Sequence, residues 1–98
     1  MVHVPVDREG IAAFCRRNHI RRLALFGSVL RPDFRPDSDV DVLVEFERGH
    51  TPGLRFFTME RELSEIMGRK VDLNTPGFLS ADFREEALRD AEVQYDTP

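Results

Sequence analysis

Two aspartates separated by one residue, Asp39 and Asp41, open an apolar segment with the pattern of a β-strand. Side chains two residues apart on a strand point to the same face and lie about 6.6 Å apart along it, so both carboxylates can reach the same one or two metal ions. The valines between and after them, Val40, Val42 and Val44, would then face a core. Carboxylate oxygens, retained waters and substrate phosphates are the ligands that Mg²⁺ prefers. The spacing therefore predicts a Mg²⁺ site at Asp39 and Asp41.

A Gly-Ser pair, Gly27-Ser28, follows an apolar run and is separated from Asp39 by ten residues. Glycine lets the backbone approach a phosphate closely, and Ser28 suits the cap of a following helical turn, whose amides attract anions. Arg31 lies three residues further on and can donate to a phosphate. We therefore interpret Gly27, Ser28 and Arg31 as candidate nucleotide-binding residues of a nucleotidyl-transfer site.

A third carboxylate, Asp72, lies in a later predicted strand, where Val71 and Leu73 would face the core and Asp72 the other side. There it could ligate one Mg²⁺ and help to deprotonate an attacking hydroxyl. Each piece has an ordinary explanation by itself: a Gly-Ser is usually a turn, and an exposed strand aspartate usually serves solubility. The assembly favours a site, because strand, Gly-Ser turn, same-face aspartates and a further strand aspartate occur together.

The elements that must position these residues follow from apolar periodicity and turn chemistry. We expect a helix over 7–17 capped by Asp7, strands over 23–27, 39–46 and 70–74, a helix from a Thr51 cap to Gly68, a last helix from a Ser80 cap through 91, and a short strand near 93–95. This order predicts an α/β fold in which a small mixed β-sheet has helices packed on it.

The whole chain sets further bounds. Its 98 residues suffice for one modest core, so we expect a single domain over 1–98. The net charge is −4, and no Lys/Arg cluster is dense enough to favour direct nucleic-acid binding. No stretch resembles a signal peptide or a membrane span, so a cytoplasmic protein is expected. His3, His19 and His50 are not at metal spacing, and structural or solvated roles are expected for them.

The segments FGSVLRPDFRPDSDVDVLVEF and GRKVDLNTPG resemble the minimal nucleotidyltransferases of the DNA polymerase beta superfamily, the MNT or MntA-type proteins. The resemblance covers nearly the full chain and implies a polymerase beta-like nucleotidyltransferase fold. One departure is Pro32, where glycine is common after the arginine. The residues that fall on the family's motif positions are Gly27, Ser28, Asp39 and Asp41, with Asp72 where its third carboxylate is expected.

The resemblance also implies a function. Such proteins are similar to antitoxins encoded beside a HEPN ribonuclease, which implies Mg²⁺-dependent transfer of AMP from ATP to a tyrosine of that toxin. Size agrees, because 98 residues hold only the nucleotide-and-metal half of a transferase and another protein would have to present the acceptor.

Two alternatives stay open. The first is a non-catalytic antitoxin that neutralises its partner by occlusion, although a pure binder has no need to crowd three carboxylates together. The second is a small-molecule nucleotidyltransferase of the antibiotic-modifying kind, which is weaker because no acceptor domain is present.

Overall fold

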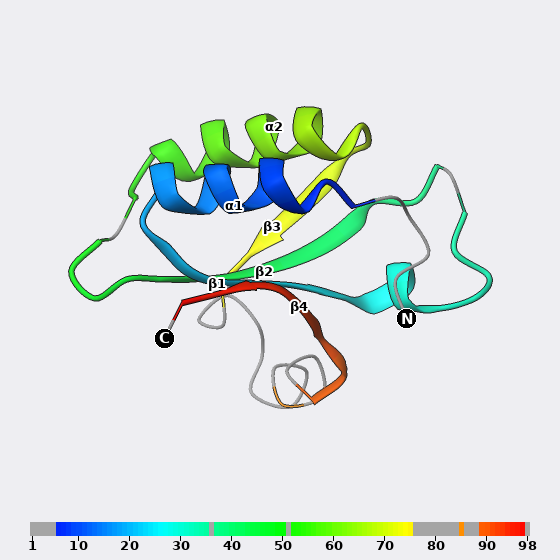
Figure 1. Ribbon diagram of the computed structural model, residues 1–98. Coiled ribbons are helices and arrows are strands. Elements are labelled where there is room, and N and C mark those ends of the chain that lie inside the picture. Colours follow the sequence, from blue (N-terminus) through cyan, green and yellow to red (C-terminus); the bar gives the residue numbers. More distant parts are fainter. Residues whose placement is uncertain (1–5, 36, 51, 76–84, 86–88, 98) are drawn as a thin grey trace.

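The computed structural model describes residues 6–35, 37–50, 52–75, 85 and 89–97. A four-stranded sheet carries two helices on one face (Figure 1). The strands are β1 (Ile20–Phe26), β2 (Val40–Phe46), β3 (Val71–Asn74) and β4 (Glu92–Asp96), in the spatial order β3-β2-β1-β4. Strand β1 is antiparallel to both neighbours, whereas β2 and β3 are parallel. The predicted small mixed sheet with helices packed on it is confirmed.

Helix α1 (Arg8–Arg17) begins and ends where its capping residues predict. The side chain of Asp7 accepts a hydrogen bond from the backbone N–H of Gly10 at 3.0 Å, and the backbone N–H of Asn18 donates to the carbonyl oxygen of Phe14 at 3.1 Å. These bonds use backbone groups that a helix terminus otherwise leaves unsatisfied.

Helix α2 (Arg55–Met67) ends at Gly68 as predicted, with Gly68 in the left-handed region at φ 70°. Its predicted start is wrong: Leu54 occupies the N-cap position without a side-chain cap, and Thr51 lies outside the described residues. The physical reason is Gly53, whose φ of 61° is not helical and allows a turn before the helix begins.

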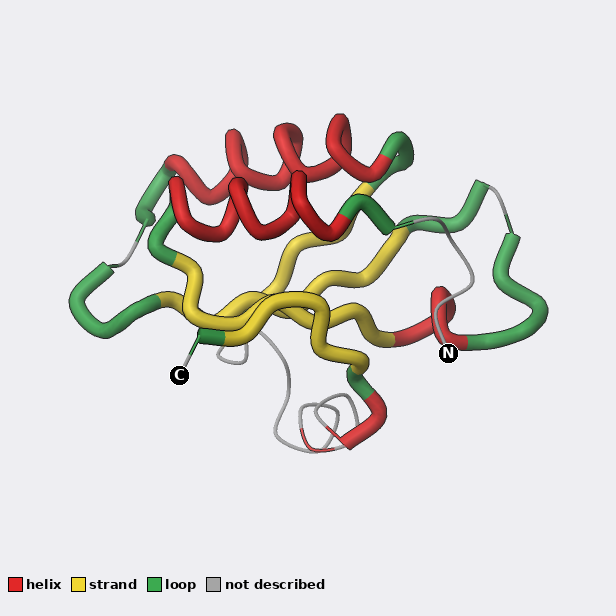
Figure 2. Tube along the Cα trace, in the orientation of Figure 1, coloured by secondary structure: helices red, strands yellow, loops and turns green. Residues whose placement is uncertain are grey.

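The core lies between the sheet and the two helices, on the face that Figure 2 shows covered by α1 and α2. From β2, the alternate residues Val40, Val42 and Val44 are all fully buried in it, as their alternation predicts. On the other face of the sheet, Phe26 and Leu43 form a smaller cluster against Ala91.

The remaining elements differ in part from expectation. Strand β1 begins three residues earlier than predicted, and the short strand near 93–95 exists as β4. Most of the predicted last helix, its Ser80 cap included, lies outside the described residues; Asp90 is helical, but Ala91 is not. In the described part of the chain, no helix has the length and apolar character needed to cross a bilayer.

Candidate active site

Strand pairing places two of the three predicted carboxylates next to each other. In the parallel ladder of β2 and β3, Asp41 lies opposite Asp72, and Val40 opposite Val71. Both valines are buried on the helix face, so the two aspartates project together from the opposite face. Asp72 is exposed and Asp41 is half-buried. Asp39 directly precedes β2 and is exposed, two residues before Asp41 on the same segment.

The Gly-Ser turn packs against Asp41 from the other side. Strand β1 pairs Phe26 with Asp41, and the chain then enters η1 (Gly27–Leu30), a single 3₁₀ turn. Gly27 has φ 76°, and a Cβ atom at this position would collide with Oδ2 of Asp41. A side chain at position 27 is therefore disfavoured by the backbone conformation, and it would displace the Asp41 carboxylate.

The role predicted for Ser28 as a helix cap is wrong. Ser28 is the second residue of η1, and no side chain caps this turn. Its backbone N–H instead donates a hydrogen bond to the Asp41 carboxylate. The backbone N–H of Arg31 closes the turn by donating to the carbonyl oxygen of Ser28 at 3.0 Å, and the Arg31 residue is exposed. The turn thus orients Asp41, and its phosphate-binding role stays a prediction.

The electrostatics of the cluster favour a bound cation. Burial raises the pKa of Asp41, the charges of Asp72 and Asp39 raise it further, and the hydrogen bond from Ser28 opposes these effects. Asp41 is therefore repelled by both other carboxylates in the protein without metal. The Nζ atom of Lys70 lies 3.8 Å from Oδ2 of Asp39 and compensates part of this charge.

The donor set fits Mg²⁺ in its chemistry, but the protein alone does not enclose an ion. Within the described ranges, no group of three or more His, Cys, Asp or Glu side chains is arranged to hold a metal. Mg²⁺ usually binds through one or two carboxylates and completes its shell with waters and substrate phosphates. Asp39, Asp41 and Asp72 fit that kind of site, and their assignment as ligands stays a prediction.

Helix α2 fixes the strand that carries Asp72. Strand β3 is at the edge of the sheet, so its outward N–H groups have no strand partner. The backbone N–H of Val71 donates to Oγ of Ser64 at 3.0 Å, and that of Leu73 donates to Oε2 of Glu60 at 2.9 Å. These two bonds flank Asp72 and hold its backbone in register with β2.

Comparison with known proteins agrees with this geometry. Residues 8–93 match the nucleotidyltransferase domain family. The chain belongs to this family. The protein is therefore a nucleotidyltransferase enzyme, and its likeness to the minimal members confirms the resemblance read from its motifs.

Two similar proteins place the chain among the minimal nucleotidyltransferases, and a third shares its fold. The protein adenylyltransferase MntA of Thermococcus cleftensis is 36% identical over 72 residues, which cover 72% of this chain and 71% of that protein. A solved structure provisionally described as a minimal nucleotidyltransferase has a TM-score of 0.72 and 38% identity, and the match covers 87% of this chain and 86% of that one. An MNT antitoxin in complex with a tri-AMPylated HEPN toxin of Shewanella oneidensis has a TM-score of 0.66, with 92% and 70% covered; its 17% identity supports the fold alone.

The structure places one further residue beside the predicted carboxylates, Lys70, which is not among the candidate residues read from the sequence. The motif consists of carboxylates and a Gly-Ser turn, whereas Lys70 is the cation paired with Asp39. A compositional signal was available, because the fourteen basic residues of the chain are thirteen arginines and one lysine.

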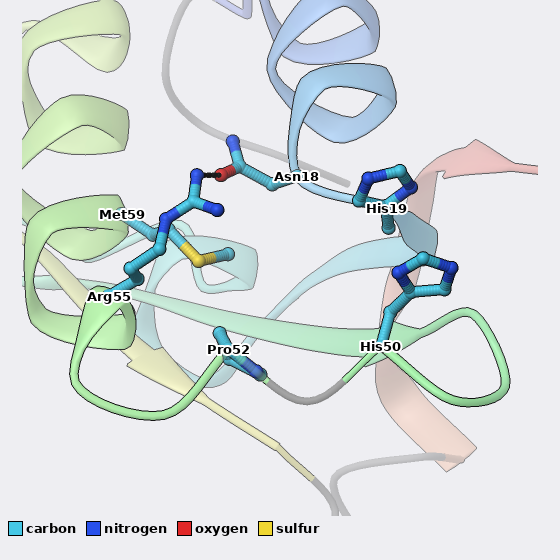
Figure 3. Close-up of a pocket in the computed structure, with 6 residues that line it drawn as sticks. All are labelled: Asn18, His19, His50, Pro52, Arg55 and Met59. Atoms are coloured by element: carbon cyan, nitrogen blue, oxygen red, sulfur yellow. Dashed lines mark hydrogen bonds between the residues drawn. The ribbon is translucent and has the colours of Figure 1, made fainter.

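Two of the histidines, for which structural or solvated roles are expected, lie together in the structure. The rings of His19 and His50 stack with centroids 4.0 Å apart and planes at 14°, beside a cavity of about 80 Å³ (Figure 3). Glu47 approaches this pair, with its Oε2 3.7 Å from Nδ1 of His19. His19 lies just before β1 and Gly27 just after it, so the length of β1 separates this cavity from the carboxylates. The histidine pair is therefore not part of the nucleotidyltransferase site.

Proposed function

We propose that this minimal nucleotidyltransferase is the antitoxin of a toxin–antitoxin pair and transfers AMP from ATP to a tyrosine hydroxyl of a HEPN-type ribonuclease toxin, with Mg²⁺ as cofactor. The observation that carries the proposal is the side-by-side placement of Asp41 and Asp72 on one face, with the Gly27-Ser28 turn packed against Asp41. The adenylyltransferase name of the similar MntA protein, and the AMPylated HEPN toxin bound to a protein of the same fold, support the choice of donor and partner.

In this proposal the carboxylates act on one phosphorus centre. The tyrosine oxygen attacks the α-phosphorus of ATP, the bond from that phosphorus to the bridging oxygen breaks, and pyrophosphate leaves. The tyrosine proton passes to a base, and Asp72 is the candidate because its exposed carboxylate adjoins Asp41. Bound Mg²⁺ supplies charge neutralisation of the triphosphate.

The site residues then have separate tasks. Asp39, Asp41 and Asp72 hold the metal, while Gly27, Ser28 and Arg31 bind the nucleotide. One domain over 1–98 binds the metal and the nucleotide, and the toxin presents the acceptor tyrosine. The proposed place of action is the cytoplasm, where ATP and the toxin both occur, without direct binding to nucleic acid or membrane.

Transfer of radiolabel from [α-³²P]ATP tests the proposal. The purified protein is incubated with a HEPN-type ribonuclease as the candidate partner, in Mg²⁺ or in excess chelator. We expect label on a tyrosine of the partner when Mg²⁺ is present and none in excess chelator. With Asp39→Asn or Asp41→Asn we expect no label even in Mg²⁺. Asp33→Asn is the matched control, because Asp33 is an exposed acid of the loop before β2. A partner that is inhibited without becoming labelled would instead favour neutralisation by occlusion.

A further inference from the structure

The single lysine of the chain lies at the candidate site. Thirteen of the fourteen basic residues are arginines, and the remaining one, Lys70, places its Nζ 3.8 Å from Oδ2 of Asp39. The Lys70 side chain is 78% exposed and that of Asp39 is 46% exposed. Exposed ion pairs of this kind add little to folding stability, so this pair is not explained as a support of the fold.

The backbone of Lys70 is held by a hydrogen bond, whereas its side chain is mostly exposed. The carbonyl oxygen of Lys70 accepts a hydrogen bond from the backbone N–H of Val40 at 2.9 Å, directly between Asp39 and Asp41. The preceding guanidinium, that of Arg69, lies 5.4 Å from the ring centroid of Phe34, in the loop that leads to Asp39. The lysine stem therefore starts from a fixed point beside the carboxylates, and its ammonium can move within reach of them.

Lysine and arginine differ in a way that matters here. A guanidinium binds a carboxylate through two parallel hydrogen bonds, which makes it a strong and persistent partner. An ammonium is a strongly hydrated point charge on a flexible stem, and it exchanges more easily. In a chain whose other thirteen Lys/Arg positions are all arginine, a lysine beside Asp39 provides a weak partner that another cation can displace.

We propose that Lys70 is a positioning residue that serves as an exchangeable counter-ion of Asp39. Its ammonium neutralises and orients the Asp39 carboxylate in the metal-free protein, and it leaves that carboxylate when a divalent cation binds. The inference rests on the proposed function, because it takes Asp39 as a metal ligand. It has a consequence for affinity: a divalent ion must compete with Lys70, so metal binding without nucleotide is weakened.

Metal titration of the nucleotide-free protein tests the competition. Mn²⁺ binding is measured by the EPR signal of the free ion for the wild type, Lys70→Met, Lys70→Arg and Arg61→Met. The last variant is the matched control, because it removes one positive charge from an exposed position of α2. We expect Lys70→Met to bind Mn²⁺ about two- to fivefold more tightly than the control, which is the range that an exposed ion pair can contribute. Lys70→Arg should bind it more weakly than the wild type.

A second measurement follows the lysine itself. Reductive methylation with ¹³C-formaldehyde labels a single side chain, Lys70, and retains its charge; the α-amino group titrates at a lower pH and is recognised by that behaviour. We expect the Lys70 methyl resonance to shift during a Mg²⁺ titration with the midpoint of Mg²⁺ binding. In Asp39→Asn the resonance should already lie at the shifted position and stay there.

The outcomes separate the inference from the function on which it rests. If the wild type binds the metal but Lys70→Met and Arg61→Met have equal affinities, or if the Lys70 resonance does not move as Mg²⁺ binds, the counter-ion role is wrong and the metal site stands. If neither the wild type nor Lys70→Met binds a divalent ion, even with ATP present, the proposed metal site and the counter-ion role are both wrong.

Discussion

At the scale of the residue, Gly27 and Asp41 form one unit. The motif predicts glycine for close approach to a phosphate, but the structure gives a second reason, which is that Asp41 occupies the space where a Cβ atom would lie. The sequence places these residues fourteen positions apart, and only the antiparallel pairing of β1 with β2 brings them into contact. Similarly, the sequence offers Ser28 as a cap, whereas its backbone N–H binds Asp41.

Substitution of Gly27 tests this contact. Gly27→Ala should destabilise the fold by about 1–3 kcal/mol, because it combines a left-handed φ with a collision, and should lose MgATP binding. Gly49→Ala is the matched control, since Gly49 has φ 85° but no atom within 4 Å of the added Cβ. Thermal unfolding and calorimetry measure both effects. Equal destabilisation by the two variants would mean that backbone strain, and not Asp41, requires glycine at position 27.

The charge of Asp41 has a cost for folding that depends on pH. Its pKa is raised in the folded protein, so folding is favoured when Asp41 is protonated, and this advantage is lost as the pH rises through the raised pKa. Asp41→Asn resembles the protonated form. It should raise Tm at pH 7, and the gain should disappear as the pH falls to about 4, near the ordinary aspartate pKa. Calorimetry at several pH values measures this, and a gain that is independent of pH would contradict it.

At the scale of the element, the position of β3, which carries Asp72, depends on hydrogen bonds to α2. Its short length and edge position leave the N–H groups of Val71 and Leu73 to Ser64 and Glu60. The apolar periodicity predicts both elements and the Gly68 stop between them. The periodicity cannot predict these hydrogen bonds. Ser64 and Glu60 are ordinary polar residues of a helix, and nothing in the sequence shows that β3 lies beside them. The start predicted for α2 at Thr51 is wrong because residues that favour turns, such as those before α2, allow a helix to begin at several neighbouring positions.

Removal of the Ser64 hydroxyl should loosen β3. In Ser64→Ala the N–H of Val71 loses its acceptor, and we expect a loss of about 1–3 kcal/mol in the free energy of unfolding. Hydrogen exchange should show faster exchange at Val71 than in the wild type. Glu60→Gln is the matched control, because an amide oxygen still accepts from Leu73. If Val71 remains as protected in Ser64→Ala as in Glu60→Gln, the helix does not hold the strand.

At the scale of the whole molecule, the order β3-β2-β1-β4 explains why the site forms where it does. The Gly27-Ser28 turn follows β1, Asp39 and Asp41 lie at the start of β2, and the flanking β3 adds Asp72. The fold class follows from the element order in the sequence. The strand order does not, because β4 comes last in the chain and pairs with β1, where Tyr95 lies opposite Leu23 and packs against the core.

The last strand should therefore matter for the stability of the entire sheet. Tyr95→Ala should lower the free energy of unfolding by about 2 kcal/mol or more, through lost apolar burial on β1. Val93→Ala is the matched control in the same strand, because Val93 is 47% exposed, and its effect should stay below about 0.5 kcal/mol. Denaturant unfolding measures both. Similar small effects would show that β4 adds little to the fold.

The most direct test of the central claim compares the partner toxin after co-expression with the wild type and with Asp72→Asn. Asp72 faces away from the core beside Asp41, and Asp39 and Asp41 remain as metal ligands when it is replaced. Its substitution should therefore leave MgATP binding and complex formation intact while slowing transfer by about 10²–10⁴-fold, the usual contribution of a general base. Intact-mass spectrometry of the HEPN partner gives the answer. We predict one or more AMP units on a tyrosine with the wild type and none with Asp72→Asn, which should bind the toxin without protecting the cell. An unmodified partner that the wild-type protein nevertheless inhibits fully would contradict the adenylyltransferase function.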